Sequence, residues 1–252
     1  MSQNGRPRVE AATTRHDHLA GEVIGRHRHP FHQLVHVSTG VLAVRTDEAS
    51  WVASGTRAMW LPADTWHEHR VYGPSSVITM AFAPDDTPLP GTLPTVVSVD
   101  PLLRELLVAY GEPGLPESES DRLRAVVRDR LRRSSVQPLV VPVPRDPRLA
   151  RACALVTADL STPRTAVWLA RHTGIGARTL ARLFRTEFGM TYPQWRTLTR
   201  AFHAMIHLAE GATVTDTAHR CGWSTTSAFI DSFTDTIGQT PGTYRTATRP
   251  CR

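Results

Sequence analysis

The second half of the chain carries the same pattern twice: a short helix, a glycine-containing turn and a second helix. In the first copy, residues 165–189, Thr165 can cap the first helix, and Thr173 with Gly174 ends it. Apolar residues at i, i+3, i+4 and i+8 spacing predict the second helix: Leu180, Leu183, Phe184 and Phe188. Two short helices joined by such a turn are typical of a helix-turn-helix unit.

The second copy spans residues 213–238. Thr213 can cap its first helix, the Cys221–Gly222 turn ends it, and Ser224 or Thr225 can cap the second helix. The second helix again has its apolar residues on one stripe: Phe229, Ile230, Phe233 and Ile237.

The order of these elements resembles the DNA-binding domain of the AraC/XylS family of transcription regulators. Residues 192–211 predict the long helix that connects the two units, and the pattern A-x-x-x-G-W…S-x-F…F…G-x-T-P-x-x-Y-R runs from Ala218 to Arg245. The resemblance implies that the second helix of each unit enters the major groove of double-stranded DNA, so that one chain reads two successive grooves.

Carried onto this chain, the resemblance assigns DNA contacts to both second helices. In the first unit they are Ala177, Arg178, Thr179, Ala181, Arg182 and Arg185, and in the second they are Thr225, Thr226 and Ser227. Because Arg178 and Arg182 are four residues apart, both can point from one helix face at guanine edges or phosphates. The alternative for these arginines is a solvated helix face.

Charge is distributed unevenly along the chain. Residues 145–252 hold 14 Arg and 7 Asp+Glu, a net of +7, whereas residues 1–144 hold 15 Arg and 16 Asp+Glu, a net of −1. A basic domain beside a near-neutral one is typical of a protein that meets a polyanion. The second recognition helix departs from the family pattern because it carries Asp231 and Asp235 in place of basic residues. We therefore predict that the first unit supplies most of the sequence-specific contact.

The first half of the chain has a β pattern instead. From about residue 20 to 83, short β-branched or aromatic runs follow one another closely between turn residues, which favours an antiparallel barrel. The expected fold class is therefore α+β, an antiparallel cupin-like β-barrel followed by an all-α double helix-turn-helix domain. We place the barrel at 15–95, a helical connector with a Pro-rich linker at 96–145, and the DNA-binding domain at 146–252.

Four histidines fall within residues 27–36. The spacing Gly21-x5-His27-x-His29-x3-Gln33-x6-Gly40 resembles the first cupin motif, with Gln33 in place of the usual Glu. The stretch Pro62–His67 resembles the second motif, with Val71 in place of its usual Asn. The resemblance implies a metal site formed by His27, His29, Gln33 and His67.

Imidazoles with an amide oxygen suit Zn, Ni, Fe(II) or Cu. The alternative is that these histidines line a small-molecule pocket or stand on the strand surface.

Other residues of the first half have less specific interpretations. We expect His32, His36 and His69 to be exposed because they appear out of phase with the motif histidines. For four large side chains we prefer packing in the barrel core to contact with an effector: Trp51, Met59, Trp60 and Trp66. If the barrel does hold an effector pocket, the residues that we assign to it are Trp60 and Trp66. The connector helix carries a stripe that can form a homodimer or pack on its own barrel: Leu123, Val126, Val127 and Leu131.

The sequence has no apolar run long enough to span a membrane, no apolar signal-peptide core at its start and no paired cysteine motif. We expect a cytoplasmic protein without membrane contact. The function that fits best is a DNA-binding transcription regulator, not an enzyme, controlled by a metal ion or small molecule. One alternative is a cupin metalloenzyme with an appended DNA-binding domain, which Gln33 argues against. Another is a DNA binder without sequence preference.

Overall fold

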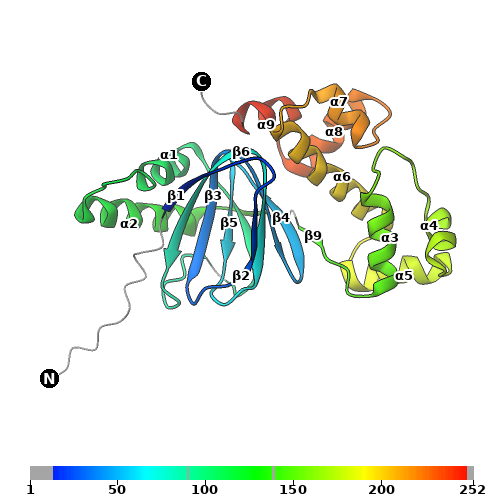
Figure 1. Cartoon of the computed structure of the whole chain (residues 1–252), viewed down its shortest axis with the longest axis horizontal. Coiled ribbons are helices and arrows are strands. Elements are labelled where there is room, and N and C mark those ends of the chain that lie inside the picture. The colour runs from blue at the N-terminus through cyan, green and yellow to red at the C-terminus, as the bar shows by residue number, and fades with distance from the viewer. Residues whose placement is uncertain (1–13, 90, 138–139, 249–252) are drawn as a thin grey trace. The chain divides into compact units, whose positions relative to one another are not determined.

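The computed structural model describes residues 14–89, 91–137 and 140–248. The chain divides into two compact units. The first comprises the described residues up to Val44 and those from Val52 to 137, and the second comprises Arg45–Trp51 with the described residues from 140 onward. The first unit contains most of the strands and the second contains seven helices among its described residues (Figure 1).

The strands of the structure form one antiparallel sheet. Its hydrogen-bonded path runs β1-β6-β3-β5-β7-β8, with β2 beside β6 and β4 between β3 and β9. This path has two ends and does not close into a ring among the described residues. The strands are β1 Thr14–His18, β2 Val23–His27, β3 His32–Thr46, β4 Ala49–Ala53, β5 Arg57–Leu61, β6 His67–Phe82, β7 Thr95–Ser98, β8 Val136–Gln137 and β9 Val141–Pro142. The predicted class, an antiparallel β domain before a helical one, is confirmed.

Two strands are longer than the sequence pattern predicts. The turn residues at 39–40 and 73–76 separate short β runs in the sequence, but in the structure they lie inside β3 and β6, which continue through them. At Gly40, φ is +81°, and a Cβ built there would lie 2.1 Å from Oγ of Ser75 and 2.6 Å from the carbonyl oxygen of Pro74. Gly40 therefore allows β3 and β6 to approach closely and does not end a strand.

Two helices complete the first unit, α1 (Pro101–Tyr110) and α2 (Glu117–Arg133). Asp100 caps α1 by accepting a hydrogen bond from the Leu103 backbone N–H at 2.8 Å. Both helices pack on the sheet, because a buried cluster joins strand residues such as Leu34 and Trp60 to Val127 and Leu131 of α2. Half of the proposed self-association stripe is therefore core, and packing on the chain's own sheet is the correct interpretation for Val127 and Leu131.

The second unit follows the predicted plan closely. Its helices are α3 Pro147–Thr157, α4 Ala166–Thr173, α5 Ala177–Phe188, α6 Tyr192–Ala209, α7 Val214–Arg220, α8 Thr226–Ile237 and α9 Pro241–Thr248. Thr165, Thr213 and Thr225 each accept a backbone N–H as the cap of α4, α7 and α8. Gly174 ends α4 in the left-handed conformation at φ +72°. None of the helices in the described part of the chain is both long and apolar enough to cross a bilayer.

Candidate functional site

Helix α5 has one buried and one exposed face. Leu180, Leu183, Phe184 and Phe188 are buried, as their spacing predicts. The opposite face exposes Ala177, Arg178, Ala181, Arg182 and Arg185, with Thr179 half-buried beside them. A hollow of about 600 Å³ is lined by Arg178, Thr179, Ala181, Arg182, Arg185 and Thr186. Three guanidinium groups thus share one open face of the helix.

The acid of α5 lies apart from this face. Glu187 accepts hydrogen bonds from the backbone N–H groups of Arg145 and Asp146 at 2.8 and 3.1 Å. Its charge therefore holds the start of α3 and is not turned toward the arginines. The exposed face of α5 is positive and suited to a polyanion.

Helix α8 presents a different surface. Thr225 and Ser227 are exposed and Thr226 is half-buried, while Asp231 and Asp235 are exposed on the same helix. The hydroxyl oxygen of Thr225 accepts the Ala228 N–H at 3.1 Å, so this oxygen already serves as the helix cap. The surface of α8 offers hydroxyl groups and carboxylates but no basic side chain.

Two arginines of α6, the helix that connects the two helix-turn-helix motifs, support the fold of the second unit. The guanidinium of Arg200 lies 3.6 Å from the centre of the Trp223 ring and donates to the carbonyl oxygen of Cys221. Burial lowers the pKa of Arg200 to about 10. Arg196 donates to the carbonyl oxygen of Leu160 at 3.3 Å. A count of charges along the sequence does not separate these half-buried arginines from the exposed ones on α5.

In the first unit, three predicted metal ligands come together. His27 of β2 lies opposite His67 of β6 in the strand register. Each of His27, His29 and His67 offers one ring nitrogen, and these atoms lie within 4.8 Å of one another. Asp64, at φ 60°, donates its N–H to the carbonyl oxygen of His29 at 2.8 Å and so ties the β5–β6 loop to that residue. We call these three residues the histidine cluster.

Backbone carbonyls fix the tautomers of the cluster. Nδ1 of His27 lies 2.8 Å from the carbonyl oxygen of Gly25, and Nδ1 of His67 lies 2.8 Å from that of Thr65. Because a carbonyl oxygen only accepts, each Nδ1 carries the proton and Nε2 keeps its lone pair. Nε2 of His67 is buried and has no hydrogen-bond partner among the described residues. A carbonyl oxygen that accepts from one ring nitrogen is what commonly orients the other nitrogen of an imidazole ligand toward a metal.

Burial favours the neutral form of two of these imidazoles, His67 and His29. It lowers the pKa of His67 to about 4, and with the charge of His27 it also lowers the pKa of His29. Metal ions bind the neutral form, so no proton has to be displaced from His29 or His67 at neutral pH. The donor set therefore fits a transition metal of the zinc, nickel, copper or ferrous iron type.

The expectation that His36 and His69 are exposed is wrong. His36 is fully buried and His69 is 5% exposed, and burial lowers the pKa of each to about 3. β3 is buried on both of its faces, so a position out of phase with the motif is still inside. His69 is two residues from His67 on β6 and so shares its face. His32 is half-buried, and its Nδ1 accepts the Ala63 N–H at 2.9 Å.

The other predicted site residues lie in different surroundings. Gln33 is 9% exposed, and its Oε1 has no hydrogen-bond partner within the part of the chain that the structure describes. Trp60 is in the core, with its ring centre 5.2 Å from that of Phe82. Trp66 is 40% exposed and lies beside the guanidinium groups of Arg26 and Arg28, so the core interpretation is wrong for this residue.

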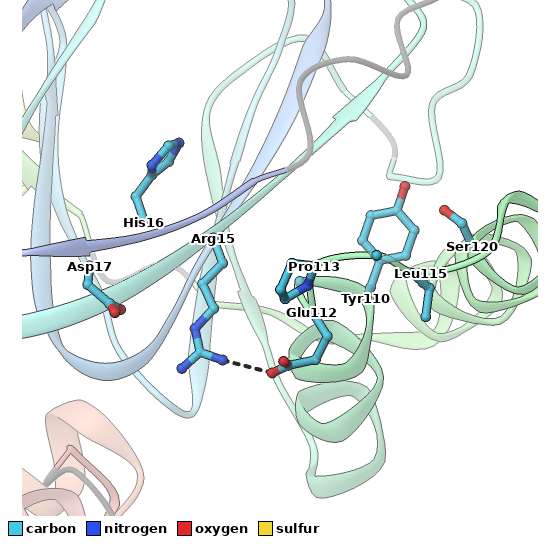
Figure 2. A pocket seen from close by; sticks show the side chains of 10 residues that line it. Arg15, His16, Asp17, Tyr110, Glu112, Pro113, Leu115 and Ser120 are labelled. Atoms are coloured by element: carbon cyan, nitrogen blue, oxygen red, sulfur yellow. Dashed lines mark hydrogen bonds and ion pairs between the residues drawn. The ribbon is translucent and has the colours of Figure 1, made fainter.

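A second feature of the first unit escaped the sequence analysis. A hollow of about 620 Å³ lies between β1 and the turn that joins α1 to α2 (Figure 2). Arg15 on its wall pairs with Glu112 at 2.8 Å and donates to Ser76 at 3.0 Å. Its lining shares no residue with the histidine cluster: Arg15, His16, Asp17, Tyr110, Gly111, Glu112, Pro113, Gly114, Leu115 and Ser120. No sequence motif marks these residues, which meet only through the fold.

Comparisons with known proteins agree with both halves of this description. Residues 169–247 match a family model described as a helix-turn-helix domain, and residues 12–125 match one described as an AraC-like ligand binding domain. The HTH-type transcriptional regulator NimR of Escherichia coli K12 is 28% identical over 222 residues, which are 86% of this chain and 81% of NimR.

Two solved structures are also similar to this chain. The DNA-binding domain of the global transcriptional factor AdpA, solved with a target DNA, is 29% identical and covers 40% of this chain and 91% of its own, with a TM-score of 0.38. ToxT from Vibrio cholerae O395 is 10% identical and covers 95% of this chain and 98% of its own, with a TM-score of 0.43.

Proposed function

Since it combines an AraC-like ligand binding domain with a helix-turn-helix domain, the chain belongs to the AraC family of DNA-binding transcriptional regulators, and we propose that a ligand bound at the histidine cluster controls how tightly the chain binds a specific DNA site. The observation that carries the proposal is the pairing of an exposed arginine face on α5 with three preoriented imidazoles in the first unit. The two sites make this a regulator with a sensor, in which ligand and DNA each change the affinity for the other.

Sequence-specific binding is assigned mainly to α5. Arg178, Arg182 and Arg185 can form charge-assisted hydrogen bonds to guanine edges and phosphates, whereas α8 reads through Thr226 and Ser227 next to two carboxylates. The preferred sequence can be identified by selecting the duplexes that the protein binds from a pool of random DNA. We call this sequence the selected site. A specific regulator prefers this site over random DNA by about 10³-fold or more, and a binder without sequence preference shows only the salt-dependent phosphate contribution.

The ligand favoured by the cluster is one divalent transition metal ion, Zn, Ni, Fe or Cu. His27, His29 and His67 would hold such an ion by donating imidazole lone pairs to it. Elemental mass spectrometry of purified, tag-free protein tests this assignment, with His27→Ala and His67→Ala as variants and the exposed His16→Ala as control. About one metal per chain, lost in the first two variants only, supports it.

A small organic effector is the second proposal. The hollow beside β1 supports it, because an Arg15–Glu112 ion pair and the Tyr110 ring offer both polar and apolar contacts (Figure 2). Absence of metal from every sample, even after incubation with Zn or Ni, would favour this effector class. A cupin metalloenzyme with an appended DNA-binding domain, the other alternative, would instead have to convert a substrate catalytically.

Cytoplasmic localisation and a homodimer are part of the proposal. On the helices of the first unit, Leu102 is 53% and Val126 is 44% exposed, and these side chains are available for self-association. Analytical ultracentrifugation of the wild type and of Leu102→Ser/Val126→Ser tests the dimer.

A further inference from the structure

We propose that His69 is the fourth ligand of the metal at the histidine cluster, so that four imidazoles and not three imidazoles with Gln33 hold the ion. This inference rests on the metal assignment made above. His69 lies outside both motif resemblances, and the structure places it by the geometry of two strands.

The position of His69 follows from β6. Successive side chains of a strand alternate between faces, so His67 and His69 point to the same side. The ring centre of His69 lies 5.0 Å from that of His67 and 5.6 Å from that of His27. His69 therefore lies next to two of the three cluster histidines.

A register shift in β2 makes the arrangement possible. Ile24 pairs with His69 and His27 pairs with His67, so three steps along β2 match two steps along β6. Residues three apart on a regular strand point to opposite faces, whereas the extra residue of a bulge restores the phase. The bulge thus turns His27 toward the side on which both β6 histidines lie.

The buried ring of His69 also lacks a partner. Its Nδ1 is buried and finds no hydrogen-bond partner among the described residues, and the side chain is only 5% exposed. An unsatisfied buried polar atom is costly in a folded protein and calls for an explanation such as a bound ion. A metal ion that accepted the lone pair of this nitrogen would remove the free-energy cost of leaving it unpaired.

Gln33 is the competing fourth ligand, because its Oε1 is also buried without a partner among the described residues. An amide oxygen is a hard donor that suits calcium or magnesium, whereas imidazole suits zinc, nickel and copper. For the metals that the three histidines select, His69 is therefore the stronger donor. A site closed by four protein ligands is typical of a structural ion and leaves no open position for catalysis.

The test uses the full chain, metal-free and then loaded with Zn²⁺ or Co²⁺. Proteins compared are the wild type, His69→Ala, His69→Asn, Gln33→Leu and the control His16→Ala. Zinc affinity is measured by competition with a chelator, and coordination by the Co²⁺ absorption spectrum. X-ray absorption on the zinc-loaded wild type counts the imidazoles directly and needs no variant.

In the wild type we expect X-ray absorption to show four imidazole ligands on zinc. In both His69 variants zinc should bind at least about 10-fold more weakly, and the Co²⁺ spectrum should change. Gln33→Leu and His16→Ala should match the wild type. Three imidazoles in the wild type, or unchanged affinity and spectrum in the His69 variants with a loss in Gln33→Leu, would overturn the role of His69 while the metal site stands. A wild type that takes up no metal would overturn the metal site itself.

Discussion

His27 and His67 face each other across the β2–β6 strand pair, with their ring centres 4.3 Å apart. Each ring donates its Nδ1 proton to a carbonyl two residues before it in the chain, which leaves two Nε2 lone pairs on the same side of the sheet. An ion bound there would connect two neighbouring strands of the sheet, and this has consequences for stability.

Zinc should stabilise the first unit. A ligand that binds only the folded state adds about 2.7 kcal/mol at 100 times its Kd, so the unfolding midpoint in urea should rise with Zn²⁺. His27→Ala and His67→Ala should lose this rise, and His16→Ala should keep it. The measurement is urea unfolding by circular dichroism with and without Zn²⁺. An equal rise in His67→Ala would show that zinc acts elsewhere.

The arginines of α5 should dominate DNA affinity. Arg178→Ala and Arg182→Ala should each weaken binding to the selected site by about 5- to 150-fold, because each removes contacts worth ~1–3 kcal/mol. Ser227→Ala should have a smaller effect, since α8 carries two carboxylates. Fluorescence anisotropy at fixed salt measures each Kd, with Arg151→Ala, exposed on α3, as the matched control. Wild-type affinity in Arg178→Ala and Arg182→Ala together would refute this division of labour.

The turn glycines of the two helix-turn-helix motifs should differ in how well they tolerate substitution by alanine. Both Gly174 and Gly222 have positive φ, at +72° and +78°, so alanine is strained at either position, by about 1–2 kcal/mol. At Gly222 a Cβ would also lie 2.2 Å from the carbonyl oxygen of Leu160, whereas at Gly174 it meets nothing within 4 Å. Gly222→Ala should therefore destabilise the second unit clearly more than Gly174→Ala in thermal unfolding. Equal losses in the two variants would contradict the close backbone contact.

The buried His36 should make the metal-free protein sensitive to acid. Burial and the charge of Arg104 lower its folded pKa to about 3, so below the ordinary value of 6.5 the unfolded chain takes up a proton that the folded chain does not. The free energy of unfolding should thus fall as the pH drops from about 6.5 toward 3, by up to ~1.4 kcal/mol per pH unit from this residue. Above pH 6.5 the residue has no such effect.

His36→Gln removes this titration and should flatten the slope, while His16→Gln, at an exposed position, should leave it unchanged. The check is urea unfolding at pH 7, 6 and 5 with a chelator present, fitted with one transition for each unit. A slope that is the same in His36→Gln as in the wild type would contradict a neutral, buried His36.

Local sequence patterns predicted most of the helices of the second unit. The stripe of Leu180, Leu183, Phe184 and Phe188 located the buried face of α5, and Thr165 and Thr213 cap the helices that were expected to begin there. These features depend on neighbours within about a turn, which the sequence displays directly.

The first unit was predicted less completely, because the ends and alignment of its strands depend on contacts between residues far apart in the sequence. Gly40 reads as a turn residue, but its role is the approach of Ser75, 35 positions later. The bulge that aligns His27 with His67 has no sequence pattern of its own, and His69 was missed although its spacing from His67 already puts it on the same face. The partial burial of Arg196 and Arg200 likewise cannot be predicted from a count of charges.

The most direct test of the account is the Kd of the full chain for the selected site, measured by fluorescence anisotropy with metal-free and metal-loaded protein in parallel. We predict that loading changes the Kd of the wild type by at least about fivefold and leaves that of His67→Ala unchanged, as a coupling of 1 kcal/mol or more between two sites requires. The same Kd for both forms of the wild type, with one metal per chain verified in the loaded sample, would contradict control of DNA binding by the histidine cluster.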